Sequence, residues 1–405
     1  MKHIIPYSEA LDFLSKKLHQ LSGIKRPQSK FLSHLFALYW TINTRINFLR
    51  MGRYSKMNEK TFRNQFEKSF DFASFYFGVL DSKKGQEMVA AFDPSFILKS
   101  GKATHGLGQF WNGKAQKSEK GLEIGCLAMV DVSEETAYHL HAVQTEVPTE
   151  GCNLICQYVK MIKDNIARIL DYTNYLAADS YFMKKDFISP LRACGLHIIT
   201  KMRSDANLRE TYVAPENVVA KKGRPKKYGS KVVLKGIDKS KWTLCLNTDE
   251  MKGYEMIAYC VTLKAFVKVV YLEKDGDKSY ALLLSTDKEL AGKTIIKYYQ
   301  LRFQIEFLIR DAKQFGGLED CQARDKKKLN FHFNMALGSV SIAKLNFWST
   351  LENKMEISFS MHNIKQVFLN KHIAENIIIN LGLDMSCEKI KHVFNNCLQI
   401  GQIAA

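Results

Sequence analysis

The spacing of apolar side chains changes along the chain and divides it into parts of different secondary structure. Near the N-terminus, apolar side chains recur at helical spacing in the segments 8–21, 28–51 and 58–77, with turn-forming residues between them. The last part of the chain, 330–405, also has a mostly helical pattern. We therefore predict helical regions at both ends.

From residue 88 the pattern changes to short buried strands with helices between them. In chain order we predict strands at 88–92, 122–132 and 136–147, a helix at 154–170, a strand at 175–178, a helix from 184 and a strand at 196–202. Strand patterns also fill much of the following segment, so a β-rich insertion of about 205–278 is expected before the last helix of this region. An alternation of this kind indicates an α/β fold.

The segment 297–317 has no internal Gly or Pro before a closing glycine pair, which predicts one helix. At about 100° per residue, Tyr299, Arg302, Glu306 and Lys313 fall on one face, opposite an apolar face. This places one carboxylate between cations and a phenol, outside the core. An ordinary ion pair of Arg302 with Glu306 on a solvated face would explain the same pattern.

Two aspartates follow short buried-strand patterns. Asp93 ends the first strand and precedes Pro94, and Asp179 ends the strand 175–178 just before a predicted helix. Each has a structural alternative, because Asp before Pro often forms a turn and Asp before a helix often caps it. Asp131 also ends a strand pattern, but the Ser-Glu-Glu that follows fits a hairpin turn.

The charge of the chain indicates a polyanionic partner. Its 59 Lys and Arg outnumber its 41 Asp and Glu, for a formal net charge of +18. No apolar run approaches the roughly 18 residues of a membrane span, so a membrane partner is not expected. The N-terminus lacks the features of a secretion signal, so the protein is expected in the cytoplasm. The nine cysteines lack framework spacing and are expected to be reduced thiols.

Basic segments mark candidate contacts with a phosphate backbone. Residues 1–80 hold 13 Lys and Arg against five acids, so the helical N-terminal region could recognise DNA or merely pack on the core. Lys102 belongs to a basic loop after the first strand. The segment 221–241 has nine basic residues and one acid, including Arg224, Lys226 and Lys227. Gly-Arg-Pro at 223–225 is similar to the core of an AT-hook, although a basic loop on phosphate is the more typical use of such a segment.

The spacing Tyr-x2-Arg-x3-Glu-x6-Lys, at Tyr299, Arg302, Glu306 and Lys313, resembles the signature of bacterial insertion-sequence transposases of insertion-sequence family four. The resemblance covers roughly residues 88–325 and implies a ribonuclease-H-like catalytic core. It implies that Glu306 is the last acid of an Asp-Asp-Glu triad. It also implies that Tyr299, Arg302 and Lys313 contact transposon-end DNA.

The same resemblance assigns Asp93 and Asp179 as the other two acids, since Ala-Asp-Ser-Tyr-Phe at 178–182 is similar to the block around the second Asp of the family. In relatives a Trp of the β-strand insertion stacks on a base flipped out of the transposon end, which here would be Trp242, and a Trp in a strand is otherwise a core residue. A homodimer in the synaptic complex is the expected assembly.

Three carboxylates without a His or Cys cluster form a hard oxygen site that suits Mg²⁺ or Mn²⁺. Phosphodiester hydrolysis is well served by two such ions, so Asp93, Asp179 and Glu306 are the expected metal ligands. The expected function is a DNA transposase that cleaves at the element's ends and joins the 3′-hydroxyl ends to double-stranded target DNA. The alternative is a catalytically inactive, domesticated DNA-binding protein of the same fold.

The expected domain organisation follows from these parts. We predict a helical domain at 1–82, expected to bind DNA, a ribonuclease-H-like α/β domain at 83–325 and a helical C-terminal region at 326–405.

Overall fold

The computed structural model describes residues 7–20, 24–148, 150–212, 227–274, 279–350 and 358–403. The helices near the N-terminus are α1 (Tyr7–Gln20), α2 (Arg26–Thr41), α3 (Phe48–Arg53), α4 (Glu59–Gln65) and α5 (Phe72–Val79), followed by the 3-10 turn η1 (Leu80–Lys83). The helices predicted at 28–51 and 58–77 are each divided in two. The side chains of Asn47 and Asp71 accept hydrogen bonds from the backbone N–H groups of Arg50 and Ser74, and so begin the new helices α3 and α5.

The core sheet has the strand order β4-β3-β1-β5-β6, with the short strand β2 on β3. Its strands are β1 (Met88–Leu98), β2 (Gly108–Asn112), β3 (Lys117–Asp131), β4 (Thr136–Thr145), β5 (Tyr175–Ala178) and β6 (His197–Met202). β5 runs parallel to β1 and β6, whereas β3 runs antiparallel to β1 and β4. The predicted order of strands and helices in this region is confirmed, except that β2 lies in the segment predicted as a basic loop.

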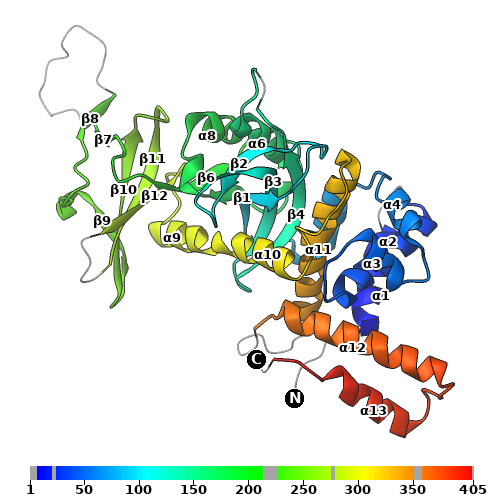
Figure 1. Ribbon diagram of the computed structural model, residues 1–405. Helices are drawn as coiled ribbons and strands as arrows, with labels where there is room; N and C mark the ends of the chain where they lie inside the picture. Colours follow the sequence, from blue (N-terminus) through cyan, green and yellow to red (C-terminus); the bar gives the residue numbers. More distant parts are fainter. Residues whose placement is uncertain are drawn as a thin grey trace, which may run out of the picture.

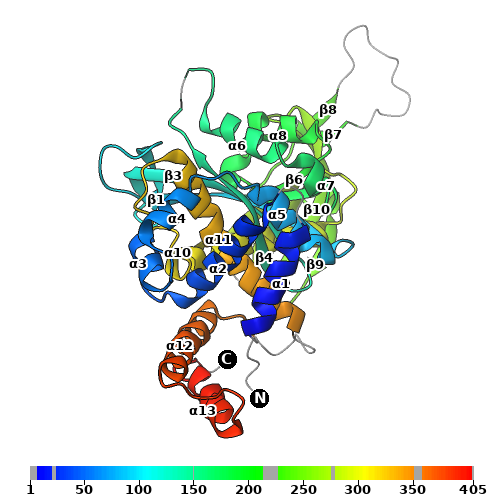
Figure 2. The same cartoon turned by 90° about the vertical axis from the view of Figure 1, so that its right-hand side faces the viewer.

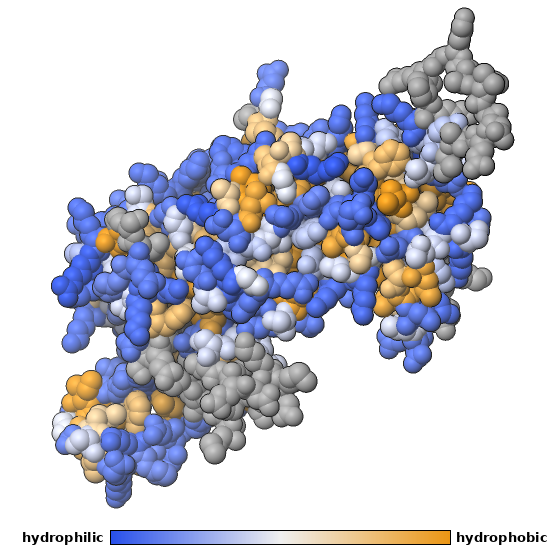
Figure 3. Space-filling model, turned by 180° about the vertical axis from the view of Figure 1, so that it is seen from behind, coloured by the Kyte–Doolittle hydropathy of each residue, from blue (hydrophilic) through white to orange (hydrophobic). Residues whose placement is uncertain are grey.

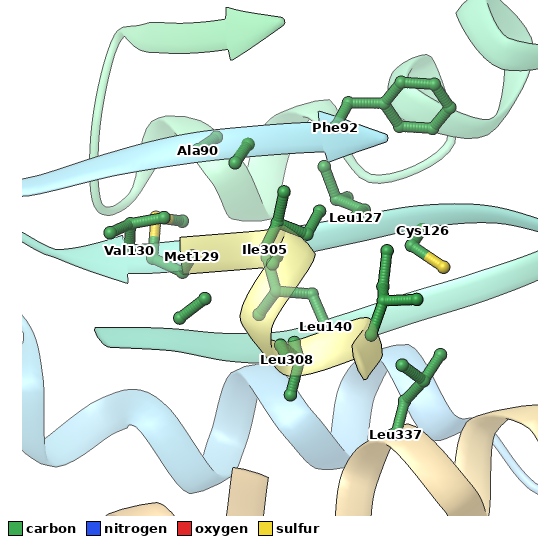
Figure 4. Close-up of a cluster of buried hydrophobic side chains, with 14 of the residues drawn as sticks. Ala90, Phe92, Cys126, Leu127, Met129, Val130, Leu140, Ile305, Leu308 and Leu337 are labelled. Atoms are coloured by element: carbon green, nitrogen blue, oxygen red, sulfur yellow. The ribbon is translucent and has the colours of Figure 1, made fainter. Parts of the chain in front are cut away.

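Helices cover both faces of the core sheet (Figure 1). On one face lie α6 (Leu154–Lys163), α7 (Ile166–Leu170), η2 (Ser180–Phe182) and α8 (Lys185–Arg192), and on the other lie α10 (Phe303–Gln314) and α11 (Lys326–Thr350). β3 is buried continuously from residue 121 to 131, as expected of a strand covered on both faces. Figure 4 shows Ile305 and Leu308 of α10 packed beside Leu127 and Leu140 of the sheet.

The strands of the predicted insertion continue the core sheet. They are β7 (Leu208–Thr211), β8 (Tyr228–Lys231), β9 (Thr243–Asn247), β10 (Met251–Cys260), β11 (Ala265–Lys274) and β12 (Tyr280–Ser285), with the 3-10 turn η3 (Lys239–Lys241) before β9. β12 pairs antiparallel with β6, with Leu282 opposite Met202, and β11 and β10 follow outward. The insertion is therefore joined to the core through backbone hydrogen bonds.

The helix predicted at 297–317 is divided at Arg302. α9 (Gly292–Leu301) ends there and α10 begins at Phe303, although the backbone of Arg302 keeps helical dihedral angles. The two helices therefore follow one another in nearly the same direction (Figure 1). α9 packs on β6, β11 and β12, and α10 packs on β1 and β4, so the pair spans the joint between core and insertion.

The C-terminal helices are α11, α12 (Met361–Asn380) and α13 (Glu388–Leu398). α11 is a layer of the core, and its residues His332, Met335 and Ala336 are buried. The N-terminal helices dock on it, since Trp40 Nε1 donates to the carbonyl of Ser339 at 2.9 Å. α12 and α13 form a hairpin that projects from the body (Figures 1 and 2). Among the described helices, none has both the length and the apolar composition that crossing a membrane requires.

Candidate active site

Two of the predicted acids lie on neighbouring parallel strands in the middle of the core sheet. β1 and β5 pair as far as Phe92 and Ala178, so Asp93 and Asp179 are the next positions on adjacent strands, which lie about 5 Å apart. Asp93 does not end its strand as predicted. β1 continues to Leu98 because antiparallel β3 still pairs with it on the other side.

Asp93 is a buried carboxyl group in an acidic environment. Burial raises its pKa to about 7, the guanidinium of Arg302 opposes this rise, and the charges of Glu306, Asp179 and Glu123 add to it. The same interactions show that the charges of Glu306 and Asp179 reach Asp93. The structure therefore brings the three predicted acids into one electrostatic cluster.

Arg302 and Glu306 form an ion pair across one turn at the start of α10, with Arg302 Nη2 2.8 Å from Glu306 Oε1. Only 4% of the Arg302 side chain is exposed, against 41% of Glu306. Arg302 therefore does not lie on a solvated face, which corrects the helical-wheel prediction. Its charge also interacts with Asp93 and Asp179, so it supplies the positive charge within the acidic cluster.

The side chains of this cluster are of the chemical type that binds a hard divalent cation. Within the described part of the chain, no three His, Cys, Asp or Glu side chains are grouped so that they could hold a metal ion. The acids that interact here are nevertheless all carboxylates, the ligands that Mg²⁺ and Mn²⁺ prefer. Asp93 is also held where an added positive charge would stabilise its ionised form.

A cleft of about 720 Å³ opens beside the two aspartates. Its walls come from β1, from the β2–β3 hairpin, from α6 and from η2. The residues that line it include Asp93, Glu123, Asp179, Trp111, Lys114, Tyr181 and Lys313. Glu306 is not among them. The cleft is thus acidic at its base and carries Lys and aromatic side chains around it.

Lys313 and Tyr299, the other residues of the predicted signature, are partly buried. Lys313 Nζ donates to the carbonyl of Phe96 at 2.6 Å and lies 3.3 Å from Glu319, so it ties α10 to β1 beside the cleft. Tyr299 is half-buried, and the Arg302 guanidinium lies 5.7 Å from the centre of its ring. Burial raises the pKa of Tyr299.

Lys102 lies outside the cleft, in a second groove of about 670 Å³. This groove runs along the end of β1 and the segment after α10. Its cationic side chains are Arg45, Lys99, Lys102 and Arg324. Two acids, Glu319 and Asp320, also line it.

Trp242 and Lys227, the predicted DNA-binding residues of the insertion that the structure describes, do not line the cleft beside the acids. Trp242 is 8% exposed and packs against Tyr271 with the ring centres 6.1 Å apart, so its indole offers no open face here. The physical reason is that it precedes β9 and covers the sheet of the insertion. Lys227 is exposed beside β8. Arg224 and Lys226 lie outside the described residues.

Glu123 is an acid that the sequence analysis did not identify. It lies opposite Phe96 in the β1–β3 register, it is buried, and the Tyr158 hydroxyl donates to it. Burial raises its pKa. In the sequence, Glu123 could have been identified as a charged residue inside an apolar strand pattern. Asp131, in contrast, accepts hydrogen bonds from the turn that follows, as predicted. It also pairs with Lys83 at 2.8 Å.

The strand order, the helices on both faces and the two acids at adjacent positions of the central parallel strands define a ribonuclease-H-like core. A family model described as "Transposase DDE domain" matches residues 85–341, which is more than half of the chain. The chain therefore belongs to the family of DDE transposase domains.

A solved structure described as a piggyBac transposase synaptic complex with hairpin DNA is similar over 98% of this chain and 84% of that chain, with 12% sequence identity and a TM-score of 0.41. No curated protein matches the chain.

Proposed function

We propose that this chain is a DNA transposase of the insertion-sequence type. It binds the ends of its element, hydrolyses the phosphodiester at each end and transfers the 3′-hydroxyl ends into target DNA. The observation that carries this proposal is the placement of Asp93 and Asp179 on adjacent parallel strands, with the charge of Glu306 reaching Asp93 from α10.

Asp93, Asp179 and Glu306 are the residues proposed to hold two divalent cations, Mg²⁺ or Mn²⁺. Such ions, when bound, activate a water or hydroxyl nucleophile and neutralise charge on the phosphate. Asp93 lies within β1, and Asp179 directly follows β5, where its carbonyl accepts a hydrogen bond from Thr200 Oγ1. Glu306 is held by Arg302 at the start of α10, and 41% of its side chain is exposed.

The proposed DNA contacts are the cations around the cleft and in the second groove. Lys114 and Lys313 line the cleft, and Lys102 and Arg324 line the groove next to it. Such side chains position a phosphate backbone without reading its sequence. In the described arrangement Arg302 acts by holding Glu306, because it is buried.

The decisive experiment is cleavage of DNA that carries the element's ends, with Mg²⁺ and purified Glu306→Gln protein. This change removes a charge with little change of shape, so binding of end DNA should persist while cleavage falls by at least about 10²-fold. Glu289→Gln, which changes an exposed Glu before α9, is the matched control and should cleave normally.

Cleavage by Glu306→Gln at the wild-type rate would refute the assignment of Glu306. A wild-type chain that binds end DNA but does not cleave it under any divalent cation would support the alternative of an inactive DNA-binding protein.

A further inference from the structure

α9, the helix that leads to Arg302 and Glu306, begins without a cap of its own. The residue before it, Ala291, has no side-chain group that could accept a hydrogen bond, and the first turn of α9, which the structure describes in full, contains no acidic residue. The first N–H groups of a helix need acceptors from outside the helix, and a carboxylate is favoured there. In this protein the acceptor comes from the insertion.

Glu255 of β10 supplies this acceptor. Its Oε2 accepts a hydrogen bond from the backbone N–H of Gly292, the first residue of α9, and its Oε1 lies 3.1 Å from Lys268 Nζ on β11. The side chains of Glu255 and Lys268 are only 18% and 12% exposed. Lys268 thus fixes one carboxylate oxygen, while the other is directed at the start of the helix.

The contact is closely fitted at Gly292. A Cβ atom at this position would lie 2.3 Å from Glu255 Oε2 and 2.8 Å from Cys245 Sγ, closer than non-bonded atoms can approach. Glycine weakens a helix relative to alanine. Its use here is therefore explained by the close approach of the carboxylate and not by helix formation.

α9 connects this contact to the proposed acids. It packs on β6, β11 and β12 and is followed in nearly the same direction by α10, with Arg302 between the two helices. Figure 3 shows the insertion, at the right of the view, and the core as one continuous surface. Glu306 lies 14 residues after Gly292, roughly 21 Å along a helix, so a shift of the first turn along the helix axis would be transmitted to it.

We propose that Glu255 is a positioning residue for Glu306. By fixing the start of α9 to the sheet of the insertion, Glu255 sets the position of α9 and α10 along their axis, and hence the place of Arg302 and Glu306 relative to Asp93 and Asp179. The packing of α9 on the sheet sets its distance from the strands, whereas the hydrogen bond at its end resists sliding. This proposal rests on the proposed function, because it concerns the placement of the third acid.

The first test compares cleavage of end DNA by Glu255→Leu and by the wild type. If Glu255 positions Glu306, kcat should fall at least about 10-fold, while KM for the DNA changes by less than about 2-fold. Glu255→Gln, whose amide oxygen can still accept from Gly292, should lose no more than about 3-fold in kcat. Glu210→Leu is the matched control and should cleave at the wild-type rate, because Glu210 of β7 is 25% exposed and pairs with Lys241 at 2.7 Å, also within the insertion.

Gly292→Ala separates positioning from helix stability. Alanine favours a helix over glycine, so a role in helix stability alone predicts cleavage at the wild-type rate. The added Cβ would displace the Glu255 carboxylate, so the proposal predicts the same fall in kcat as for Glu255→Leu. This variant also decides between the two roles if Glu255→Leu does not fold.

A second measurement needs no DNA. In Glu255→Leu, hydrogen exchange of the backbone amides should become faster at 292–296 and also at 303–308, at the start of α10, because the helix pair is no longer fixed at its end. Loss of a merely local cap would affect the first turn of α9 alone. The strands β1 and β5 should exchange as in the wild type.

A normal kcat in Glu255→Leu, or faster exchange confined to 292–296, would overturn the proposal. So would recovery of kcat in the double variant Glu255→Leu with Ala291→Ser, because Ser provides a local cap without a link to the insertion. Failure of the proposed function is a separate result. If the wild type never cleaves end DNA, the exchange rates at 303–308 still support or contradict the link from Glu255 to α10.

Discussion

At the scale of single residues, the most informative side chain is Arg302. Arginine is seldom buried unless it is paired, yet only Nη2 of this guanidinium has a hydrogen-bond partner among the described residues, while Nε and Nη1 have none. Its charge interacts with Glu306, Asp93 and Asp179. We infer that Arg302 offsets the repulsion among these carboxylates, so that its charge matters more than its hydrogen bonds.

Replacing Arg302 with Met should therefore destabilise the protein without added metal. The expected loss is about 1–3 kcal/mol in the free energy of unfolding, less than for a fully buried pair because Glu306 is partly solvated. Millimolar Mg²⁺ should restore more stability to the variant than it adds to the wild type, since a ligand that binds the folded state stabilises it. Urea unfolding with and without Mg²⁺ measures both effects.

Arg310→Met is the matched control for this prediction. Arg310 lies on the same helix, is 62% exposed and pairs with Asp311 at 3.1 Å. Its replacement should cost under about 1 kcal/mol, with or without Mg²⁺. Equal losses in the two variants would show that Arg302 has no special electrostatic role.

At the scale of elements, Lys365 of α12 joins three helical segments. Its Nζ donates to the carbonyl of Tyr39 in α2 at 3.0 Å and to that of Phe315 after α10 at 2.8 Å. Burial lowers the pKa of Lys365 to about 7, and the charge of Asp320 opposes this change. The hairpin is thus attached to the body through a buried amine at the end of the helix that carries Glu306.

This attachment predicts a pH dependence of stability. The pKa of Lys365 is about 7 in the folded chain and near 10.5 when unfolded, so between these values the unfolded state binds more protons. Stability contributed by Lys365 should therefore rise with pH from about 7 towards 10, by up to about 1.4 kcal/mol per pH unit. Lys365→Met should lose this rise, as measured by urea unfolding across the range.

Lys391→Met provides the comparison for the pH series, because Lys391 is half exposed on α13 and pairs with Glu388. The slope of its unfolding free energy against pH should match that of the wild type. A Lys365→Met protein with an unchanged slope would contradict the assignment of the proton to Lys365.

At the scale of the whole molecule, the chain has a net charge of +18, and the groove that Lys102 lines carries four cationic side chains against two acids. If the groove of Lys102 and Arg324 follows a phosphate backbone, replacing both by Ala should reduce the slope of log affinity against log salt by about 1 to 2 for duplex DNA. Binding isotherms at several salt concentrations give this slope. Lys163→Ala, at an exposed position of α6, should leave it unchanged, and a flat salt dependence in the wild type would assign the charge to solubility instead.

Local patterns in the sequence were sufficient for the order of elements in the core. Hydrophobic periodicity depends only on residues that are neighbours in the chain. It therefore indicates the buried runs that end at Phe92 and Ala178, the helix between them and the long segment before Glu306. The acids were also visible, because a carboxylate at the end of an apolar run is conspicuous. The spacing around Glu306 identified the transposase class, while membership in insertion-sequence family four and the roles of individual residues remain predictions.

Only the tertiary structure decided what surrounds each of these residues. Asp93 lies within a strand because distant β3 pairs beyond it, and Arg302 is buried because α9 and α10 pack on different parts of one sheet. Trp242 is covered by its own insertion, whereas Trp111, 57% exposed on a hairpin, lines the cleft. These outcomes depend on contacts between residues far apart in the chain, and a local pattern of hydrophobic and polar positions contains no information about such contacts.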